Sequence, residues 1–267
     1  MAFPATTPIF SCALMQNAVF RHIYSMRQYL LKACFYLREW FFPFGCSLCG
    51  KALISGTESW YGLCDDCRTA IERDLAESRA GITCDCCGKP LISEHGRCLS
   101  CRNGEERAFD RVTVLFPYTG KYRQLLAAYK FRKNLALGNF FAEKIRQTLE
   151  LGVLPEGALV PVPPRRGKIR KNGWDQVEYL AALLEKQGIN RPIKRCLKRL
   201  PSKSQKELGR ENRQSNLKGR IVPVRALPGA AIVIDDVMTT GATLDACAEA
   251  LKKAGTQSVY GLCLFCD

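Results

Sequence analysis

A short stretch near the end of this chain constrains its fold more than any other feature. Residues 231–234 are apolar and β-branched, which predicts a buried strand. Asp235 and Asp236 follow directly, then a run of small residues, and then a segment of helical composition at 244–254. The stretch therefore predicts a strand, an acidic pair and a turn at the start of a helix. In an open parallel α/β sheet, ligands bind at such strand ends.

The small residues after the acidic pair are suited to a phosphate. Backbone N–H groups at a helix N-terminus attract anions, and hydroxyl side chains add further donors. Asp235 and Asp236 could accept hydrogen bonds from paired hydroxyls or hold a hydrated magnesium ion. An ordinary strand-to-helix turn with a threonine N-cap would need neither tandem aspartates nor several small hydroxyl residues. We therefore expect a sugar-phosphate site whose phosphate loop consists of Thr239, Thr240, Gly241, Ala242 and Thr243.

This stretch resembles the phosphoribosyl diphosphate (PRPP) signature of type I phosphoribosyltransferases, in which two acids precede a Thr-Thr-Gly-x-Thr loop. The resemblance implies that Asp235 and Asp236 hold the ribose hydroxyls, that the loop holds the 5′-phosphate and that Mg²⁺ accompanies PRPP. Purine-salvage members have an aspartate where Thr239 stands, and a threonine cannot serve as a general base at neutral pH. The resemblance therefore leaves the acceptor, and catalytic turnover itself, open.

Eight of the fifteen cysteines form four Cys-x2-Cys pairs within residues 46–101, a spacing typical of metal sites rather than disulfides. Two pairs separated by a short insert match a tetrahedral four-thiolate zinc site of the zinc-ribbon type, which is structural rather than catalytic. Buried reduced thiols and an iron–sulfur cluster are the alternatives. Cys86 leaves the register of one pair open, and the two repeats could exchange partners. We expect two zinc sites, formed by Cys46, Cys49, Cys64 and Cys67 and by Cys84, Cys87, Cys98 and Cys101.

Positive charge predicts anionic partners for this chain. Its net charge is +15 and its isoelectric point is about 9.3, which fits phosphates, nucleic acid or a membrane surface. A basic loop follows a proline-edged segment, and we expect Arg166, Lys168 and Arg170 to bind diphosphate; a solvated basic loop is the alternative. A second basic run, 191–220, is too polar for a core and is interpreted as a flap or an anion-binding surface.

Strands and helices alternate after the cysteines, which predicts an α/β fold with a parallel sheet flanked by helices, as in the type I phosphoribosyltransferases. Strands are expected at 111–116, 158–162, 231–234 and 257–265, and helices at 65–78, 122–131, 136–149, 176–185 and 244–254. We divide the chain into an N-terminal extension with an amphipathic helix (1–43), a double zinc ribbon (44–109) and a phosphoribosyltransferase-like domain (110–267).

The N-terminal extension contains an apolar and aromatic segment, 18–42, that is interrupted by charges every few residues. No uncharged run is long enough to span a bilayer, so we expect an amphipathic helix packed on its own protein; a membrane-surface helix is the alternative. Residues 1–20 lack the features of a signal peptide. Reduced metal-binding cysteines then predict a cytoplasmic protein.

Taken together, these motifs are similar to the ComF family of phosphoribosyltransferase-like proteins, known from competence and DNA uptake. The similarity covers nearly everything from Phe42 onward. The family's Arg-Gly-Phe-Asn-Gln corresponds to residues 172–176 here, with three substitutions that weaken the inference of a shared role for this loop. The other matching features are the segment 125–131, the sequence Val-Pro-Val-Pro at 160–163, and Gln205, Leu208, Arg213 and Asn216.

The family resemblance implies a PRPP-type site in a protein that acts in DNA uptake, natural transformation or DNA processing by binding single-stranded DNA, with a helicase or recombination proteins as partners. An active phosphoribosyltransferase of nucleotide metabolism and a PRPP-sensing regulator without turnover are the alternatives. For DNA binding, Tyr129, Phe131 and Trp174 could stack on bases, or could belong to the core.

Overall fold

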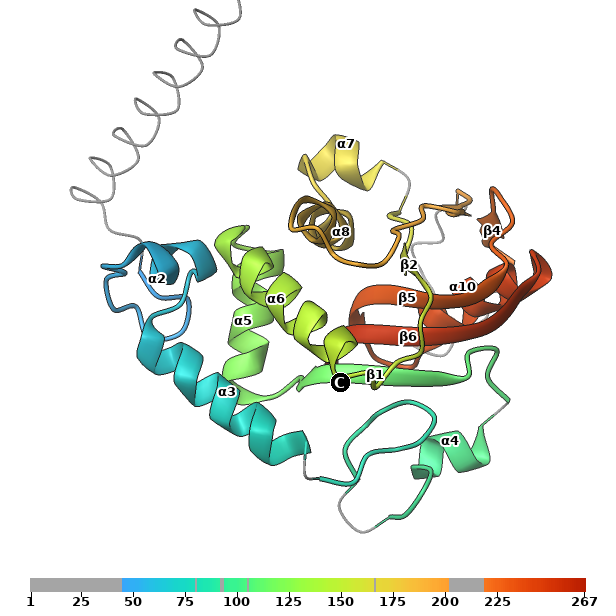
Figure 1. Ribbon diagram of the computed structural model, residues 1–267, viewed down its shortest axis with the longest axis horizontal. Coiled ribbons are helices and arrows are strands. Elements are labelled where there is room, and N and C mark those ends of the chain that lie inside the picture. Colours follow the sequence, from blue (N-terminus) through green and yellow to red (C-terminus); the bar gives the residue numbers. More distant parts are fainter. Residues whose placement is uncertain (1–44, 80, 92–93, 105, 166, 202–218) are drawn as a thin grey trace, which may run out of the picture. The chain divides into compact units, whose positions relative to one another are not determined.

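Four parallel strands form the central sheet, in the order β1-β6-β5-β2 (Figure 1). The structure, a computed structural model, describes residues 45–267 apart from 80, 92–93, 105, 166 and 202–218. The extension and the helix expected at 18–42 lie outside the described residues. The strands are β1 (Arg111–Pro117), β2 (Ala158–Pro161), β5 (Gly229–Met238) and β6 (Thr256–Cys266). The expected α/β fold with a parallel sheet is confirmed.

Helices cover both faces of this sheet because its strands are apolar on both sides. Along β5, Ile232 and Ile234 enter one hydrophobic core, whereas Ala231 and Val233 enter the other. The first core includes α5 (Gly120–Lys130), α6 (Ala136–Glu150) and α8 (Gln176–Lys186). The second core includes α10 (Ala242–Lys253). The helices expected in this half of the chain are thus present, with shifts of one or two residues at their ends.

A small antiparallel sheet lies against α10. It pairs β3 (Leu197–Arg199) with β4 (Ile221–Pro223), and residues 202–218 between them are not described. The interpretation of 191–220 as too polar for a core is wrong at its start. Arg191 is buried, and its guanidinium donates to the carbonyl of Pro155 at 2.6 Å, so hydrogen bonds compensate for its burial.

The two cysteine modules repeat one backbone arrangement. In each, an isolated antiparallel bridge closes a tight turn, Gly45 with Ala52 and Thr83 with Pro90. Each turn is followed by a second cysteine pair at the start of a helix. These helices are α3 (Asp65–Arg79) and α4 (Leu99–Asn103), and α2 (Gly56–Tyr61) lies between the cysteine pairs of the first module. The helix expected at 65–78 is confirmed.

The modules pack against different parts of the fold. The first contributes Cys46 and Cys64 to the core that contains α5, α6 and α8. The second contributes Cys84 and Cys86 to the opposite core, and the N–H of Val112 in β1 donates to the carbonyl of Cys86 at 2.8 Å. Residues 45–267 therefore form one compact unit that includes both modules.

Candidate functional site

The acidic pair lies within β5, three and two residues before its end, and not after the strand as the sequence predicted. Asp235 and Asp236 expose only 8% and 7% of their surface. The N–H of Asp236 donates to Oδ1 of Asp235 at 2.8 Å, and the N–H of Val237 donates to Oδ1 of Asp236 at 2.9 Å. The two carboxylates are therefore tied to the strand's own backbone, which holds them side by side at the carboxyl end of the sheet.

Asp236 has two further partners from distant parts of the chain. Its Oδ2 accepts from Nζ of Lys130, the last residue of α5, at 2.9 Å and from Nε2 of Gln176, the first residue of α8, at 2.6 Å. Burial acts to raise the pKa of Asp236, but the ammonium and amide donors outweigh it and hold that pKa below its ordinary value. This carboxylate is therefore ionised at neutral pH.

Asp235 has the opposite environment. Burial raises its pKa well above the ordinary value, and the neighbouring charge of Asp236 raises it further. Two buried carboxyls in contact do not ionise together readily, so the pair favours one proton and one negative charge. Such a pair offers both a hydrogen-bond donor and acceptors, which suits two adjacent hydroxyls.

The predicted phosphate loop leads from β5 into α10. Thr239 and Thr240 are exposed, and Gly241 is the N-cap with φ of 76°, a conformation that favours glycine. No side chain caps the helix, although the hydroxyl of Thr240 accepts weakly from the N–H of Ala242 at 3.4 Å. Thr243 lies in the first turn and is partly buried. The start of this twelve-residue helix thus has the geometry of an anion site.

Arg107 was not identified from the sequence, yet it lies beside this loop. Its guanidinium donates to the carbonyl of Thr240 at 3.2 Å and lies 3.8 Å from Asp245 in the first turn of α10. The carboxylate of Asp245 also accepts from the N–H of Ala108 at 2.7 Å. The loop is thereby held on the segment that precedes β1, and Arg107 places a positive charge at the loop.

The three residues predicted to bind diphosphate have different environments. Arg166 lies outside the described residues. Lys168 begins the short helix α7 (Lys168–Asn172), and its Nζ lies 2.6 Å from both Asp175 and the side-chain oxygen of Gln176. Arg170 is exposed on α7. Gln176 therefore connects Lys168 to Asp236, and a diphosphate would have to compete with Asp175 for Lys168.

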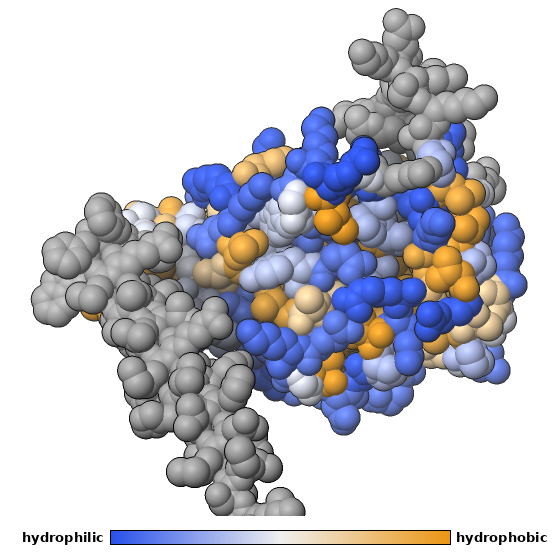
Figure 2. Space-filling model, turned by 90° about the horizontal axis from the view of Figure 1, so that it is seen from above, coloured by the Kyte–Doolittle hydropathy of each residue, from blue (hydrophilic) through white to orange (hydrophobic). Residues whose placement is uncertain are grey.

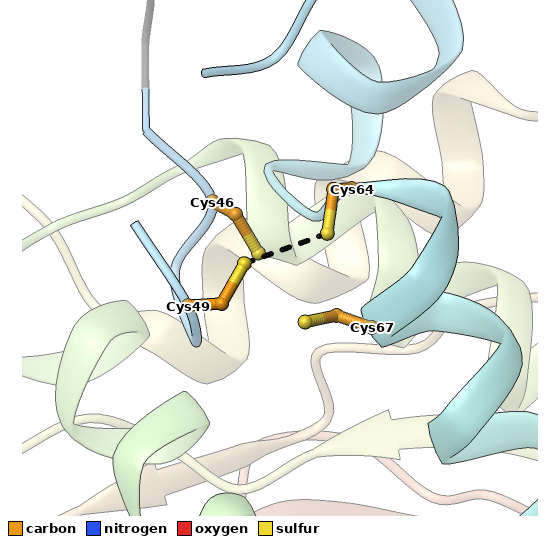
Figure 3. Close-up of side chains that lie close together, drawn as sticks. All are labelled: Cys46, Cys49, Cys64 and Cys67. Carbon is orange, nitrogen blue, oxygen red and sulfur yellow. Dashed lines mark hydrogen bonds between the residues drawn. The ribbon is translucent and has the colours of Figure 1, made fainter. Parts of the chain in front are cut away.

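Both groups of four cysteines converge as the spacing predicts. In each group all Sγ atoms lie within 4.8 Å of one another, and neither group exchanges a member with the other or includes Cys86. Figure 3 shows the four sulfurs of the first group pointing toward a common centre. The sulfur pairs Cys49–Cys64 and Cys87–Cys98 are 3.6 and 3.8 Å apart. A tetrahedral zinc with Zn–S bonds of about 2.3 Å requires sulfurs about 3.8 Å apart.

The first cysteine of each module is prepared for metal binding by its backbone. Burial acts to raise the pKa of Cys46 and Cys84, but backbone N–H donors of the turn and of the second cysteine pair lower each pKa to about 7. A thiolate is the form that binds metal. Both groups could therefore hold a structural zinc ion, which is consistent with the expected zinc-ribbon module.

Of the three aromatic residues suggested for base stacking, one belongs to the core. Tyr129 is fully buried, and its hydroxyl donates to the carbonyl of Gln176 at 2.7 Å. The ring of Trp174 packs edge-on against Tyr129, with centroids 5.4 Å apart. Phe131, in contrast, is 73% exposed. The stacking interpretation is therefore wrong for Tyr129 and is open for Phe131.

The fold and these sites define an α/β protein with two four-cysteine modules and a buried acidic pair before a helix N-terminus. No family model matches the chain. It is 26% identical over 239 residues to Competence protein F of Haemophilus influenzae, covering 83% of this chain and 97% of that protein. It is 28% identical over 203 residues to Competence protein ComFC of Streptococcus pneumoniae, covering 74% and 84%.

A further relative, DNA utilization protein YhgH of Escherichia coli, is 24% identical over 234 residues, covering 82% of this chain and 95% of that protein. Each of these similarities covers most of both chains. The resemblance to the ComF family is confirmed. Within the part of the chain that the structure describes, no helix is long and apolar enough to cross a membrane.

Proposed function

We propose that this protein binds PRPP or a related sugar phosphate with Mg²⁺ and acts in DNA uptake or DNA processing by binding single-stranded DNA. The observation that carries the sugar-phosphate part is the acidic pair. Asp235 and Asp236 are held side by side, the first with a raised and the second with a lowered pKa, and the predicted phosphate loop begins three residues after Asp236. Few structural roles would justify two buried carboxyls in contact, because their burial costs free energy.

The described contacts indicate how a ligand would enter. The ribose hydroxyls would replace Lys130 and Gln176 as the hydrogen-bond donors to Asp236. The 5′-phosphate would lie against the loop 239–243. Lys130, released from Asp236, would then be available to a phosphate oxygen. Mg²⁺ would be held by water-mediated contacts to carboxylate and diphosphate oxygens. We assign Arg166, Lys168 and Arg170 to the diphosphate, with Lys168 leaving Asp175.

The DNA part of the proposal is supported by the relatives and by charge. Three curated relatives are named for competence or for DNA utilization, and they match at least 74% of this chain. A net charge of +15 favours a polyanionic partner. Zinc in the two cysteine groups would hold the modules in place and take no part in the chemistry.

Calorimetry with PRPP and Mg²⁺ tests the site. The double variant Asp235→Asn/Asp236→Asn should lose PRPP binding. The variant Asp65→Asn/Asp66→Asn is a matched control, because it removes two tandem carboxylates that are exposed at the start of α3. It should bind PRPP as the wild type does. Equal binding by all three proteins, or no binding by the wild type, would contradict the proposed site.

Single-stranded DNA titrated into the same proteins at two salt concentrations tests the second part. Wild-type affinity should fall steeply as salt rises, because binding releases counterions from the phosphates. Neither double variant should weaken DNA binding, since each only makes the protein more positive. If the wild type fails to bind DNA even at low salt, the DNA part of the proposal is wrong.

A further inference from the structure

Two acid-free segments meet on the surface near the acidic pair. Residues 111–142 and 157–174 together contain eleven basic residues and no acidic one. They come into contact where Nζ of Lys133, after α5, donates to the carbonyl of Asn172 at the end of α7, at 2.9 Å. We call the exposed residues on either side of this contact the loop–α7 surface: Phe131, Arg132, Lys133, Ile169, Arg170 and Lys171.

We propose that single-stranded DNA binds on the loop–α7 surface, with Phe131 stacking on a base and the basic residues contacting phosphates. This inference rests on the DNA-binding part of the proposed function and adds where the strand lies and which residue contacts a base. It does not require PRPP binding, although Arg170 is also assigned to the diphosphate.

The exposure of Phe131 is the first reason to place DNA on this surface. Phe131 follows the buried Tyr129 by two residues, where the helix ends, and the residue is 73% exposed instead of joining the core. The residue between them, Lys130, points inward to Asp236. A single exposed apolar residue is ordinary on a protein surface. Here, however, the exposed ring lies between an inward-facing lysine and two exposed basic side chains.

The charge of the surface is the second reason. None of Arg132, Lys133, Arg170 and Lys171 forms an ion pair with a described residue, although the chain pairs many of its other basic side chains. Unpaired like charges close together repel one another, so they are usually neutralised by a partner or by salt. Figure 2 views the molecule from the side on which α7 lies in Figure 1, and shows hydrophilic residues interspersed with small apolar patches.

The backbone at Lys133 is the third reason. Its φ is 53°, the left-handed conformation, and among the described residues it is the only one besides glycines with a positive φ. This conformation costs a residue with a side chain free energy, and such positions gather at functional sites. The turn brings the Lys133 ammonium to α7 and leaves Phe131 exposed to solvent. The contact of Lys133 with α7 joins the two basic segments into one surface.

These features fit single-stranded nucleic acid better than other polyanions. A basic surface that follows the backbone, with an aromatic ring on which any base can stack, is the usual means of binding single strands without sequence preference. Bases in a duplex are already stacked on one another, so an exposed ring could not reach their faces. An anionic membrane offers the same charge but no planar partner for the ring.

Fluorescence anisotropy with a labelled oligo(dT) tests the inference. Phe131→Ala should weaken binding about 5- to 100-fold, the range for loss of one base–aromatic stack. Phe131→Trp should retain the wild-type affinity. Leu151→Ala is the matched control, because Leu151 is 57% exposed at the end of α6 and outside the surface. It should bind as the wild type does.

An oligonucleotide of the same length without bases separates stacking from a structural effect. Phe131→Ala and the wild type should bind this abasic strand equally, whereas the double variant Arg170→Gln/Lys171→Gln should bind both strands more weakly and with a shallower salt dependence. If Phe131→Ala weakens both strands alike, the ring acts through the fold and the stacking role is overturned.

Two further outcomes distinguish the proposals. If the wild type binds oligo(dT) and Phe131→Ala binds it equally, DNA lies elsewhere and only the location is wrong. If the wild type binds neither strand but binds phosphatidylserine vesicles in a way that Phe131→Ala abolishes, the surface serves a membrane, and both the location and the DNA part of the proposed function are overturned.

Discussion

The ammonium of Lys130 lies 2.9 Å from a carboxylate oxygen of Asp236, although the two residues are 106 positions apart in the chain. This contact joins the end of α5 to the end of β5 and helps to lower the pKa of Asp236, whereas burial and the neighbouring charge raise the pKa of Asp235. The site is therefore neutralised by the protein itself before any ligand arrives.

Replacing Lys130 with methionine should destabilise the protein. The variant keeps the length of the side chain but removes the cationic partner of the buried Asp236, which keeps Gln176 as a neutral donor. Removing one partner of a fully buried pair costs about 3–5 kcal/mol, and Lys130 is partly exposed, so we expect a loss of about 1–3 kcal/mol in the free energy of unfolding. Urea denaturation measures it.

Lys121→Met provides the comparison. Lys121 pairs with Asp74 at 2.7 Å, but both side chains of this pair are about a third exposed or more. Such surface pairs contribute about 0–1 kcal/mol. A loss of equal size in the two variants would show that burial of Asp236 has no energetic consequence.

Asp235→Asn should stabilise the protein at neutral pH, even though it should abolish PRPP binding. The pKa of Asp235 is raised in the fold, so its contribution to stability is complete below the unfolded pKa, about 4, and is lost as pH rises toward the folded pKa. Asparagine does not titrate. The stability advantage of the variant should therefore grow from pH 5 to pH 8, by at most about 1.4 kcal/mol per pH unit.

Denaturation curves of both proteins at several pH values within this range measure that advantage, and zinc content should be checked at each. The pKa of Asp236 is lowered, so Asp236→Asn should destabilise the protein above about pH 4. A pH-independent difference between Asp235→Asn and the wild type would show that Asp235 titrates normally.

Glycines at equivalent positions of the two cysteine turns should respond differently to alanine. Gly50 and Gly88 have φ of 75° and 70°, so both substitutions incur about 1–2 kcal/mol of backbone strain. A Cβ on Gly50 meets nothing within 4 Å, whereas one on Gly88 would lie closer than 3.0 Å to the carbonyl oxygen of Val112. We expect Gly88→Ala to lower the free energy of unfolding by about 1–3 kcal/mol more than Gly50→Ala. Thermal denaturation with zinc present compares them.

Zinc content should depend on Cys87 and not on Cys86, its neighbour in the chain. Cys87 belongs to the second four-cysteine group and Cys86 does not. By mass spectrometry of the purified protein, Cys87→Ser should retain one equivalent of zinc and Cys86→Ser two. Two equivalents in both variants, or one in both, would contradict the assigned ligands.

The cysteine groups and the acidic strand could be predicted because their signals are local. A Cys-x2-Cys turn and an apolar run ending in two aspartates each lie within a few residues, and the structure confirms the grouping within repeats and the strand. The partners of Asp236 could not be predicted, since packing of α5 and α8 brings them from distant positions. Lys130 does fall in the segment 125–131 that resembles the ComF family, and this was the available signal.

Lys168 shows a second limit of sequence reasoning. A lysine in a basic loop resembles a free anion donor, yet Asp175, seven residues later, lies within 2.6 Å of it. In contrast to the ion pair of Lys168, the burial of Tyr129 could be predicted from the spacing of apolar residues along the helix. Tyr129 follows Leu125 by four residues on the apolar face of α5, and both are fully buried. By the same spacing, Phe131 does not lie on the apolar face of α5.

The hydrogen bond from Val112 to Cys86 has a further consequence. Because β1 is the outermost strand, its free side would offer unpaired backbone groups to another chain, and sheet edges of this kind lead to aggregation. The second cysteine turn occupies part of that edge. Its metal would then protect the solubility of the whole protein as well as the local fold, and chelation would produce oligomers joined along β1 before the sheet itself unfolds.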